Sequence, residues 1–258
     1  MQEKLSKDIV LEIIKRVGYC YAKDSSRPNI NGILVVPTHD RICAVATDGH
    51  RLAVWNDTDS SEDLESVFMQ GAVIEYVRKW HDDIESVTIE SHNHSQYPIR
   101  VKMKTEEDKK QLKGEVTLRS VEFNLGEVDF PPYRMIIPNH SSISVFTHTL
   151  KFKHDLNVLK KNKEKIVKLF TDQNKLYMVG AEGPDDETKK KGRLEIGDVT
   201  QGKLFNGELF KAGYNMTYLY ECVKSIPQVT ICIKLSGQYD PMVIKSEDST
   251  HVIMPMRV

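Results

Sequence analysis

The sequence predicts an α+β fold with two similar domains, residues 1–138 and 139–258, in each of which two helices lie on antiparallel sheets. Amphipathic helical patterns alternate with short strand-like runs along the whole chain. The order helix, two strands, helix, three strands occurs twice, with a boundary near Pro138. A length of 258 residues is enough for two domains of ordinary size.

The first predicted domain opens with a helix over residues 6–20. Its start is marked by Ser6, whose hydroxyl can cap the first free amides, and helical spacing relates Ile9, Val10, Ile13, Ile14 and Val17. Two strands follow at 33–36 and 42–55, joined by a turn at 37–40, and a second helix covers 70–81. Three alternating segments, at 87–89, 99–103 and 116–118, have the period of half-solvated antiparallel strands.

The second predicted domain repeats this order. We expect a helix over 154–170, strands at 176–179 and 194–196, and a second helix at 215–225. Three strands close the chain, at 229–235, 242–244 and 252–254. Two polar stretches, 104–114 and 183–192, are predicted to be exposed loops between strands.

Composition excludes several classes of function. A net charge of −1 means that any contact with nucleic acid comes from local clusters of basic residues. The chain has no run of 18 apolar residues and no signal-peptide core, so we expect it in the cytoplasm, away from membranes. Four cysteines without Cys-x-x-Cys spacing predict reduced, packed thiols.

No pattern in the sequence predicts catalysis. A glycine-rich phosphate loop and a Gly-x-Ser-x-Gly motif are both missing from the sequence, so we expect neither an enzyme nor a cofactor. His92 and His94 could bind a metal ion, but no third ligand is evident, so a solvated loop is the better interpretation and we predict no metal site.

Two short segments indicate a binding function. Residues 46–53, Ala-Thr-Asp-Gly-His-Arg-Leu-Ala, put a turn and a basic pair directly after an apolar run. Residues 252–258, Val-Ile-Met-Pro-Met-Arg-Val, are apolar and rich in methionine, which suits adaptable peptide binding. Either segment alone is better interpreted as a structural turn or an edge strand, and only the two together favour a binding site.

Five motifs in order resemble the bacterial DNA polymerase III beta subunit, the sliding clamp, over its middle and C-terminal domains. In that family the sheets form the outside of a ring and the helices line its hole. The motifs are Asn-Gly at 31–32, Thr-Asp-Gly-His-Arg-Leu-Ala-Val at 47–54, Phe-Pro-Pro-Tyr-Arg at 130–134, Gly-Tyr-Asn-Met-Thr-Tyr-Leu at 213–219 and the end at 252–258.

The resemblance implies a pocket that grips peptides of polymerases and clamp loaders. An apolar cleft with a few polar groups suits such a ligand, and Gly49 can take the positive φ that its turn requires. The family often has a second basic residue after Tyr-Arg, where this chain has Met135, which leaves the preferred peptide open. The implied lining residues are Ile30, Thr47, Gly49, His50, Arg51, Leu52, Pro131, Ile136, Val252 and Met254, with Asn215, Tyr218, Met256 and Arg257 in a neighbouring lobe.

The resemblance also implies sequence-independent contact between hole-facing helices and double-stranded DNA. For any single lysine, a solvated helix face is an equally good interpretation. The run at 160–168 is nevertheless denser than a neutral chain requires, and flexible lysines suit weak attraction to phosphates. The candidates are Lys4, Lys7, Lys15, Arg16, Arg78, Lys79, Lys160, Lys161, Lys163, Lys165, Lys168 and Lys224.

The family's ring has six similar domains, three from each of two chains. A chain with two domains would need three copies, so the resemblance leads us to expect a head-to-tail homotrimer. The predicted function is a processivity clamp that encircles duplex DNA and tethers polymerase. The alternative is an adaptor that keeps the peptide pocket but does not encircle DNA, and that binds or competes for clamp-binding peptides.

Overall fold

The computed structural model describes residues 2–24, 26–37, 42–56, 66–90, 98–103, 120–124, 128–180, 192–201 and 210–257. The chain forms two compact units. The first contains Met1–Gly49 and Trp55–Pro131, and the second contains His50–Val54 and Pro132–Val258. A five-residue piece of the first half therefore belongs to the second unit, which the sequence did not predict. The domain boundary placed after residue 138 stays a prediction.

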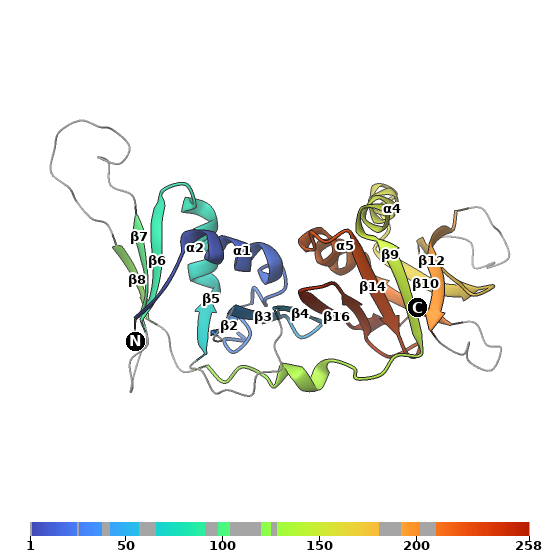
Figure 1. The fold of residues 1–258 in the computed structure, drawn as a ribbon, viewed down its shortest axis with the longest axis horizontal. Helices are drawn as coiled ribbons and strands as arrows, with labels where there is room; N and C mark the ends of the chain where they lie inside the picture. Colours follow the sequence, from blue (N-terminus) through green and yellow to red (C-terminus); the bar gives the residue numbers. More distant parts are fainter. Residues whose placement is uncertain are drawn as a thin grey trace. The chain divides into compact units, whose positions relative to one another are not determined.

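The first unit has two helices beside antiparallel strands (Figure 1). One sheet has the order β1-β6-β7-β8, and a second set of strands has the order β3-β2-β5. Both helices turn an apolar face inward, with Ile13 and Ile74 almost completely buried. The elements are β1 (Gln2–Leu5), α1 (Lys7–Val17), β2 (Gly32–Pro37), β3 (Ile42–Thr47), β5 (Val67–Gln70), α2 (Gly71–Trp80), β6 (Ile84–Glu90), β7 (Pro98–Met103) and β8 (Ser120–Asn124).

The second unit has strands in the order β17-β13-β10-β11-β12-β9-β14-β15-β16-β4, with α4 and α5 packed on each other and on one side of these strands (Figure 1). Phe152, Leu156 and Leu219 fill the core between helices and sheet. The elements are β4 (Arg51–Trp55), η1 (Tyr133–Ile136), β9 (Ile143–His148), α4 (Thr149–Lys161), β10 (Ile166–Asp172), β11 (Lys175–Gly180), β12 (Leu194–Gln201), β13 (Lys211–Asn215), α5 (Met216–Ser225), β14 (Thr230–Leu235), β15 (Met242–Lys245), β16 (Ser249–Ile253) and β17 (Pro255–Met256).

The α+β class, with helices beside antiparallel sheets, is confirmed. The described elements repeat as strand, helix, four strands, helix, three strands, first from β1 to β8 and again from β9 to β16. Each α-helix follows a strand with at most one residue between them, as at β5–α2 and β13–α5. The strands before the helices were missed because no turn residue separates the two periodicities.

Two elements in the first half were predicted to be longer than they are. The first helix ends at Val17 because Gly18 caps it, and Ser6 caps its start by accepting from the Ile9 amide at 3.3 Å. The predicted strand 42–55 is two strands, β3 and β4, which are broken at Gly49, where φ is +87°.

The predicted helix at 154–170 is wrong in both its limits. Helix α4 starts at Thr149 and ends at Lys161, and Ile166–Asp172 is strand β10. The chain leaves the helix through Asn162 and Lys163, which has a positive φ of 62°. Residues 166–172 bury nearly alternate side chains, so the apolar positions that suggested a helix belong to a sheet.

The predicted strand at 116–118, the loop at 104–114, most of the loop at 183–192 and the pair His92 and His94 lie outside the described residues. Within the described ranges, no helix is both long and apolar enough to cross a bilayer. The same ranges contain no group of three His, Cys, Asp or Glu side chains placed to hold a metal ion.

Candidate functional site

In the first unit, the turn after β3 is fixed by side chains and by one backbone amide. The Gly49 amide donates to the Thr47 hydroxyl at 3.1 Å, and the positive φ of Gly49 is as predicted. The Ala22 amide donates to the carbonyls of both Ile30, at 3.0 Å, and Thr47, at 3.2 Å. This shared donor holds the carbonyls of two predicted lining residues, Ile30 and Thr47, close together. Both residues are largely buried.

In the second unit, the segment after that turn meets the end of the chain. The Met254 amide donates to the His50 carbonyl at 3.0 Å. The His50 ring lies nearly parallel to the Tyr218 ring, with 6.4 Å between centroids. The unit therefore joins three of the predicted pocket residues, which come from the residue before β4, from α5 and from the C-terminal segment.

Arg51 connects β4 to helix α5. Its guanidinium donates to the Glu221 carboxylate at 2.6 Å and lies over the Tyr218 ring, 4.2 Å from the centroid. The Arg51 side chain is only 9% exposed and that of Glu221 is 38% exposed, so the arginine half of this pair is shielded from water. Arg51 therefore positions the Tyr218 ring, and its own side chain offers little surface to a ligand.

Glu221 was not predicted, because a glutamate in an amphipathic helix looks like an ordinary solvated residue. Asn215 was predicted as a pocket residue, and it also caps α5. Its side-chain oxygen accepts from the amides of Thr217, at 2.9 Å, and Tyr218, at 3.2 Å. The Asn215 oxygen therefore fixes the first turn of the helix that carries Tyr218.

An open cavity of about 580 Å³ lies along the C-terminal segment of the second unit. Tyr239, which is 71% exposed, forms one part of it, and no pattern in the sequence singles out this residue. The thioethers of Met254 and Met256 are both partly exposed. The residues that line the cavity are Tyr239, Met254, Pro255, Met256 and Arg257.

The other predicted lining residues differ in accessibility. Leu52 and Val252 are 2% and 1% exposed, so they support the wall from the core and offer no surface to a ligand. Ile136 is 42% exposed on η1, beside the well-exposed Met135, and Pro131 is partly exposed at the end of the first unit.

Three of the six predicted DNA-facing residues of the first unit are held by acidic or backbone partners. The prediction that Arg16 faces DNA is corrected. The Arg16 side chain is buried, pairs with Glu12 at 2.6 Å and lies over Trp55, so phosphates cannot reach it. Lys15 also pairs with Glu12, and Arg78 donates to the Gly18 carbonyl. Lys7 and Lys79 lie on α1 and α2, and Lys4 is on β1 and not on a helix.

The predicted DNA-facing lysines of the second unit are exposed except for Lys168, which is half-buried, and they do not share one helix. Lys160 and Lys161 end α4, where the Lys160 ammonium lies 4.0 Å from the centre of the Tyr220 ring. Lys163 and Lys165 are in the connection after α4, and Lys168 is on β10, which corrects their placement on a helix. Lys224 is exposed in the last turn of α5.

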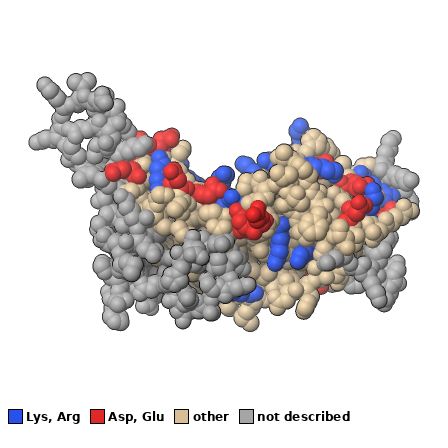
Figure 2. All heavy atoms as spheres, viewed as in Figure 1, with Lys and Arg blue, Asp and Glu red and all other residues tan. Residues whose placement is uncertain are grey.

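Basic and acidic side chains are mixed on the face shown in Figure 2. Blue side chains line the upper edge of the part that contains α4 and α5, whereas red and blue alternate over the part that contains α1 and α2. The helices of the second unit therefore carry the less balanced positive charge on this face.

Comparison with known families identifies the class of protein. Residues 4–112 match the family model of the DNA polymerase III beta subunit, central domain, and residues 134–257 match that of its C-terminal domain. The chain belongs to the DNA polymerase III beta subunit family.

Particular relatives are similar over almost the whole chain. The Beta sliding clamp of Haemophilus influenzae is 25% identical over 99% of this chain and 65% of its own length, and that of Chlamydia trachomatis is 23% identical over 98% and 56%. The beta subunit structure from Pseudomonas aeruginosa has a TM-score of 0.73 at 20% identity, with all of this chain and 66% of that one covered. The chain thus spans less than two thirds of the length of these relatives.

Proposed function

We propose that the chain is a DNA sliding clamp, a processivity factor without catalytic activity that encircles duplex DNA and tethers polymerase. The observation that carries this proposal is the repeated order of strands and helices in two units, in a chain of the beta subunit family. Exposed lysines on and after α4 suit loose attraction to phosphates, because lysine does not lock to one register as bidentate arginine does.

Six such domains would form a ring from three copies of a chain with two units, joined head to tail. One sheet edge supports this arrangement. Strand β8 lies at the edge of its sheet among the described strands. Pairing β8 of one copy with a strand of the next would satisfy that edge.

Self-association is further supported by two exposed apolar side chains on α4. Leu150 and Val158 are 68% and 38% exposed, and a spacing of eight residues puts them on one face of the helix. The same side of α4 reaches β12, because the Lys151 ammonium donates to the Glu195 carbonyl.

Retention on DNA tests the ring. Loaded onto a nicked circular plasmid by a clamp loader, the protein should stay bound through gel filtration and be lost after the circle is linearised. Its mass by light scattering should be three times the 29.6 kDa of the chain. Retention that ignores topology, or a monomeric mass at micromolar concentration, would rule out the trimeric ring.

A second function is a non-encircling adaptor for clamp-binding peptides. It is favoured by one observation, that the cavity beside Tyr239 lies within a single unit and does not depend on assembly. Peptide binding by a monomer, without topological retention on DNA, would select this function.

A further inference from the structure

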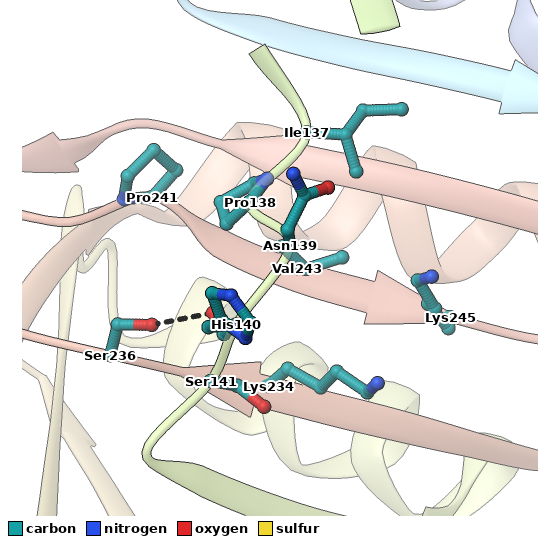
Figure 3. Close-up of a pocket in the computed structure, with 10 residues that line it drawn as sticks. All are labelled: Ile137, Pro138, Asn139, His140, Ser141, Lys234, Ser236, Pro241, Val243 and Lys245. Atoms are coloured by element: carbon teal, nitrogen blue, oxygen red, sulfur yellow. Dashed lines mark hydrogen bonds between the residues drawn. The ribbon is translucent and has the colours of Figure 1, made fainter. Parts of the chain in front are cut away.

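A second, smaller pocket of the second unit is lined by none of the residues predicted to bind peptide or DNA. It forms where residues 137–141 cross β14 and β15 (Figure 3). The crossing segment is fastened at its end, because the Ser236 hydroxyl donates to the His140 carbonyl at 3.0 Å and the Ser142 amide donates to the Leu235 carbonyl at 2.9 Å. The pocket is lined by Ile137, Pro138, Asn139, His140, Ser141, Lys234, Ser236, Pro241, Val243 and Lys245.

Two lysines bring positive charge to one side of this pocket. Lys234 pairs with Val243, and Cys232 pairs with Lys245, so the antiparallel register places both lysines on the same face of β14 and β15. Figure 3 shows both side chains on the same side of the crossing segment. Burial raises the pKa of the Cys232 thiol, and both ammonium groups oppose that rise, so both lie near this one point.

No acidic side chain balances the two lysines within the lining. None of the ten lining residues is Asp or Glu, and neither lysine forms an ion pair with another described residue. Of the acidic residues near them in sequence, Glu247 is exposed, Asp240 lies against Gly237, and Asp248 accepts from the Ser246 hydroxyl. Two like charges at diagonal positions of a strand pair repel each other unless an anion lies between them.

We propose that this pocket binds a phosphate group, either free phosphate or a small phosphomonoester. The cavity of about 140 Å³ is small, yet a single water needs only roughly 10–15 Å³, so a tetrahedral anion fits with some of its waters. Lysine ammonium groups bind phosphate as point charges, whereas a planar carboxylate is better matched by arginine. The hydroxyl of Ser141 and the amide of Asn139 add donors at the rim.

Titration of the full chain with inorganic phosphate, followed by backbone amide NMR at constant ionic strength, tests the site. We expect saturable shifts at Ser236, Val243 and Lys245. The substitutions Lys234→Gln and Lys245→Gln should each weaken binding at least fivefold. A matched variant, Lys153→Gln on α4, should bind phosphate as the unchanged protein does, and melting curves should show that all variants are folded.

Parallel titrations distinguish the ligand. Glycerol 3-phosphate should bind at least as tightly as phosphate if a phosphomonoester is the natural occupant, and weaker binding would assign the site to free phosphate. Acetate and chloride should give no saturable shifts. Shifts that stay linear with phosphate, or that persist in the double variant Lys234→Gln with Lys245→Gln, would overturn the proposal.

Discussion

The backbone amide of Met254 donates a hydrogen bond to the carbonyl of His50 at 3.0 Å, across more than two hundred residues of sequence. Both residues belong to the second unit, because the five residues His50–Val54 fold with the C-terminal half of the chain. The two segments that indicated a binding site are thus joined directly to each other. A ligand that contacts the Met254 side chain therefore lies beside backbone that is held by the hydrogen bond between Met254 and His50.

Peptide binding should depend on the exposed side chains of the cavity. Replacement of Met254 by alanine, or of Tyr239 by alanine, should weaken the binding of a fluorescent polymerase peptide about tenfold. Loss of one interface anchor costs more than about 1 kcal/mol of binding free energy. Anisotropy titrations measure this. Val229→Ala, which alters another well-exposed apolar residue, is the matched control. Leu52→Ala is unsuitable, because Leu52 is buried and its loss would cost about 2–5 kcal/mol of stability. Unchanged affinity in both variants would place the peptide elsewhere.

The ion pair between Arg51 and Glu221 should stabilise the second unit. Glu221→Gln should lower the free energy of unfolding by about 1–2 kcal/mol, since Arg51 is left without its partner but Glu221 is partly solvated. Urea denaturation measures the loss, and Glu247→Gln, at an exposed site, should cost nothing. Combining Glu221→Gln with Arg51→Met in a double-mutant cycle should give a non-additive result; strict additivity would mean that the pair contributes no coupling.

DNA attraction should come from the exposed lysines that follow α4. The double variant Lys161→Glu with Lys163→Glu should reduce retention on circular DNA and lower the slope of log affinity against log salt by up to about 2, because two phosphate contacts are lost. Lys160 is left intact because it lies over Tyr220. The pair Lys23→Glu with Lys211→Glu changes the net charge equally elsewhere and should retain DNA normally. If the two pairs behave alike, net charge and not this cluster attracts DNA.

Assembly should depend on the apolar face of α4. Leu150→Gln with Val158→Gln should shift the mass in solution toward a monomer and leave the melting temperature nearly unchanged, because both side chains are exposed and glutamine is a good helix former. Sedimentation equilibrium measures the change. Met135→Gln, which alters an 84% exposed side chain on η1, is the control. A double variant that keeps the mass of the unchanged protein would exclude α4 from the interface.

The pair Tyr21 and Glu75 should give the first unit a pH-dependent stability. The Tyr21 hydroxyl donates to the Glu75 carboxylate at 2.5 Å, and burial, followed by this bond, raises the pKa of Tyr21 from 10.0 to about 12. The hydrogen bond from Tyr21 is also the main cause that lowers the pKa of Glu75 below 4.5. Because Glu75 is largely exposed, Tyr21→Phe should cost only about 1 kcal/mol near neutral pH.

The shifted pKa values of Tyr21 and Glu75 define the pH ranges in which the stability difference between the unchanged protein and Tyr21→Phe disappears. A raised tyrosine pKa contributes stability below pH 10.0 that is lost as the pH rises toward 12. A lowered glutamate pKa contributes stability above pH 4.5 that is lost as the pH falls further. Urea midpoints of the unchanged protein and Tyr21→Phe should therefore converge at both extremes, and a gap that is constant with pH would contradict the assigned bond.

Local patterns in the sequence determined much of the fold. The helices α2 and α5 were predicted within one residue, since their apolar faces and polar ends are visible in the residues themselves. The turn at Gly49 was also predicted, because a positive φ is accessible to glycine at little cost. In contrast, strand β10 was taken for the end of a helix, because its periodicity is resolved only by the neighbouring strands that pair with it.

The sequence by itself determined which residue types supply the candidate site, since His50, Arg51 and the methionines at 254 and 256 stand in two short motifs. Only the tertiary structure decided their accessibility and partners. Pairing across the sheet buried Leu52 and Val252, and packing of α5 against β4 set Glu221 beside Arg51. Burial and ion pairing depend on contacts between segments far apart in the chain, and such contacts leave no local periodicity to read.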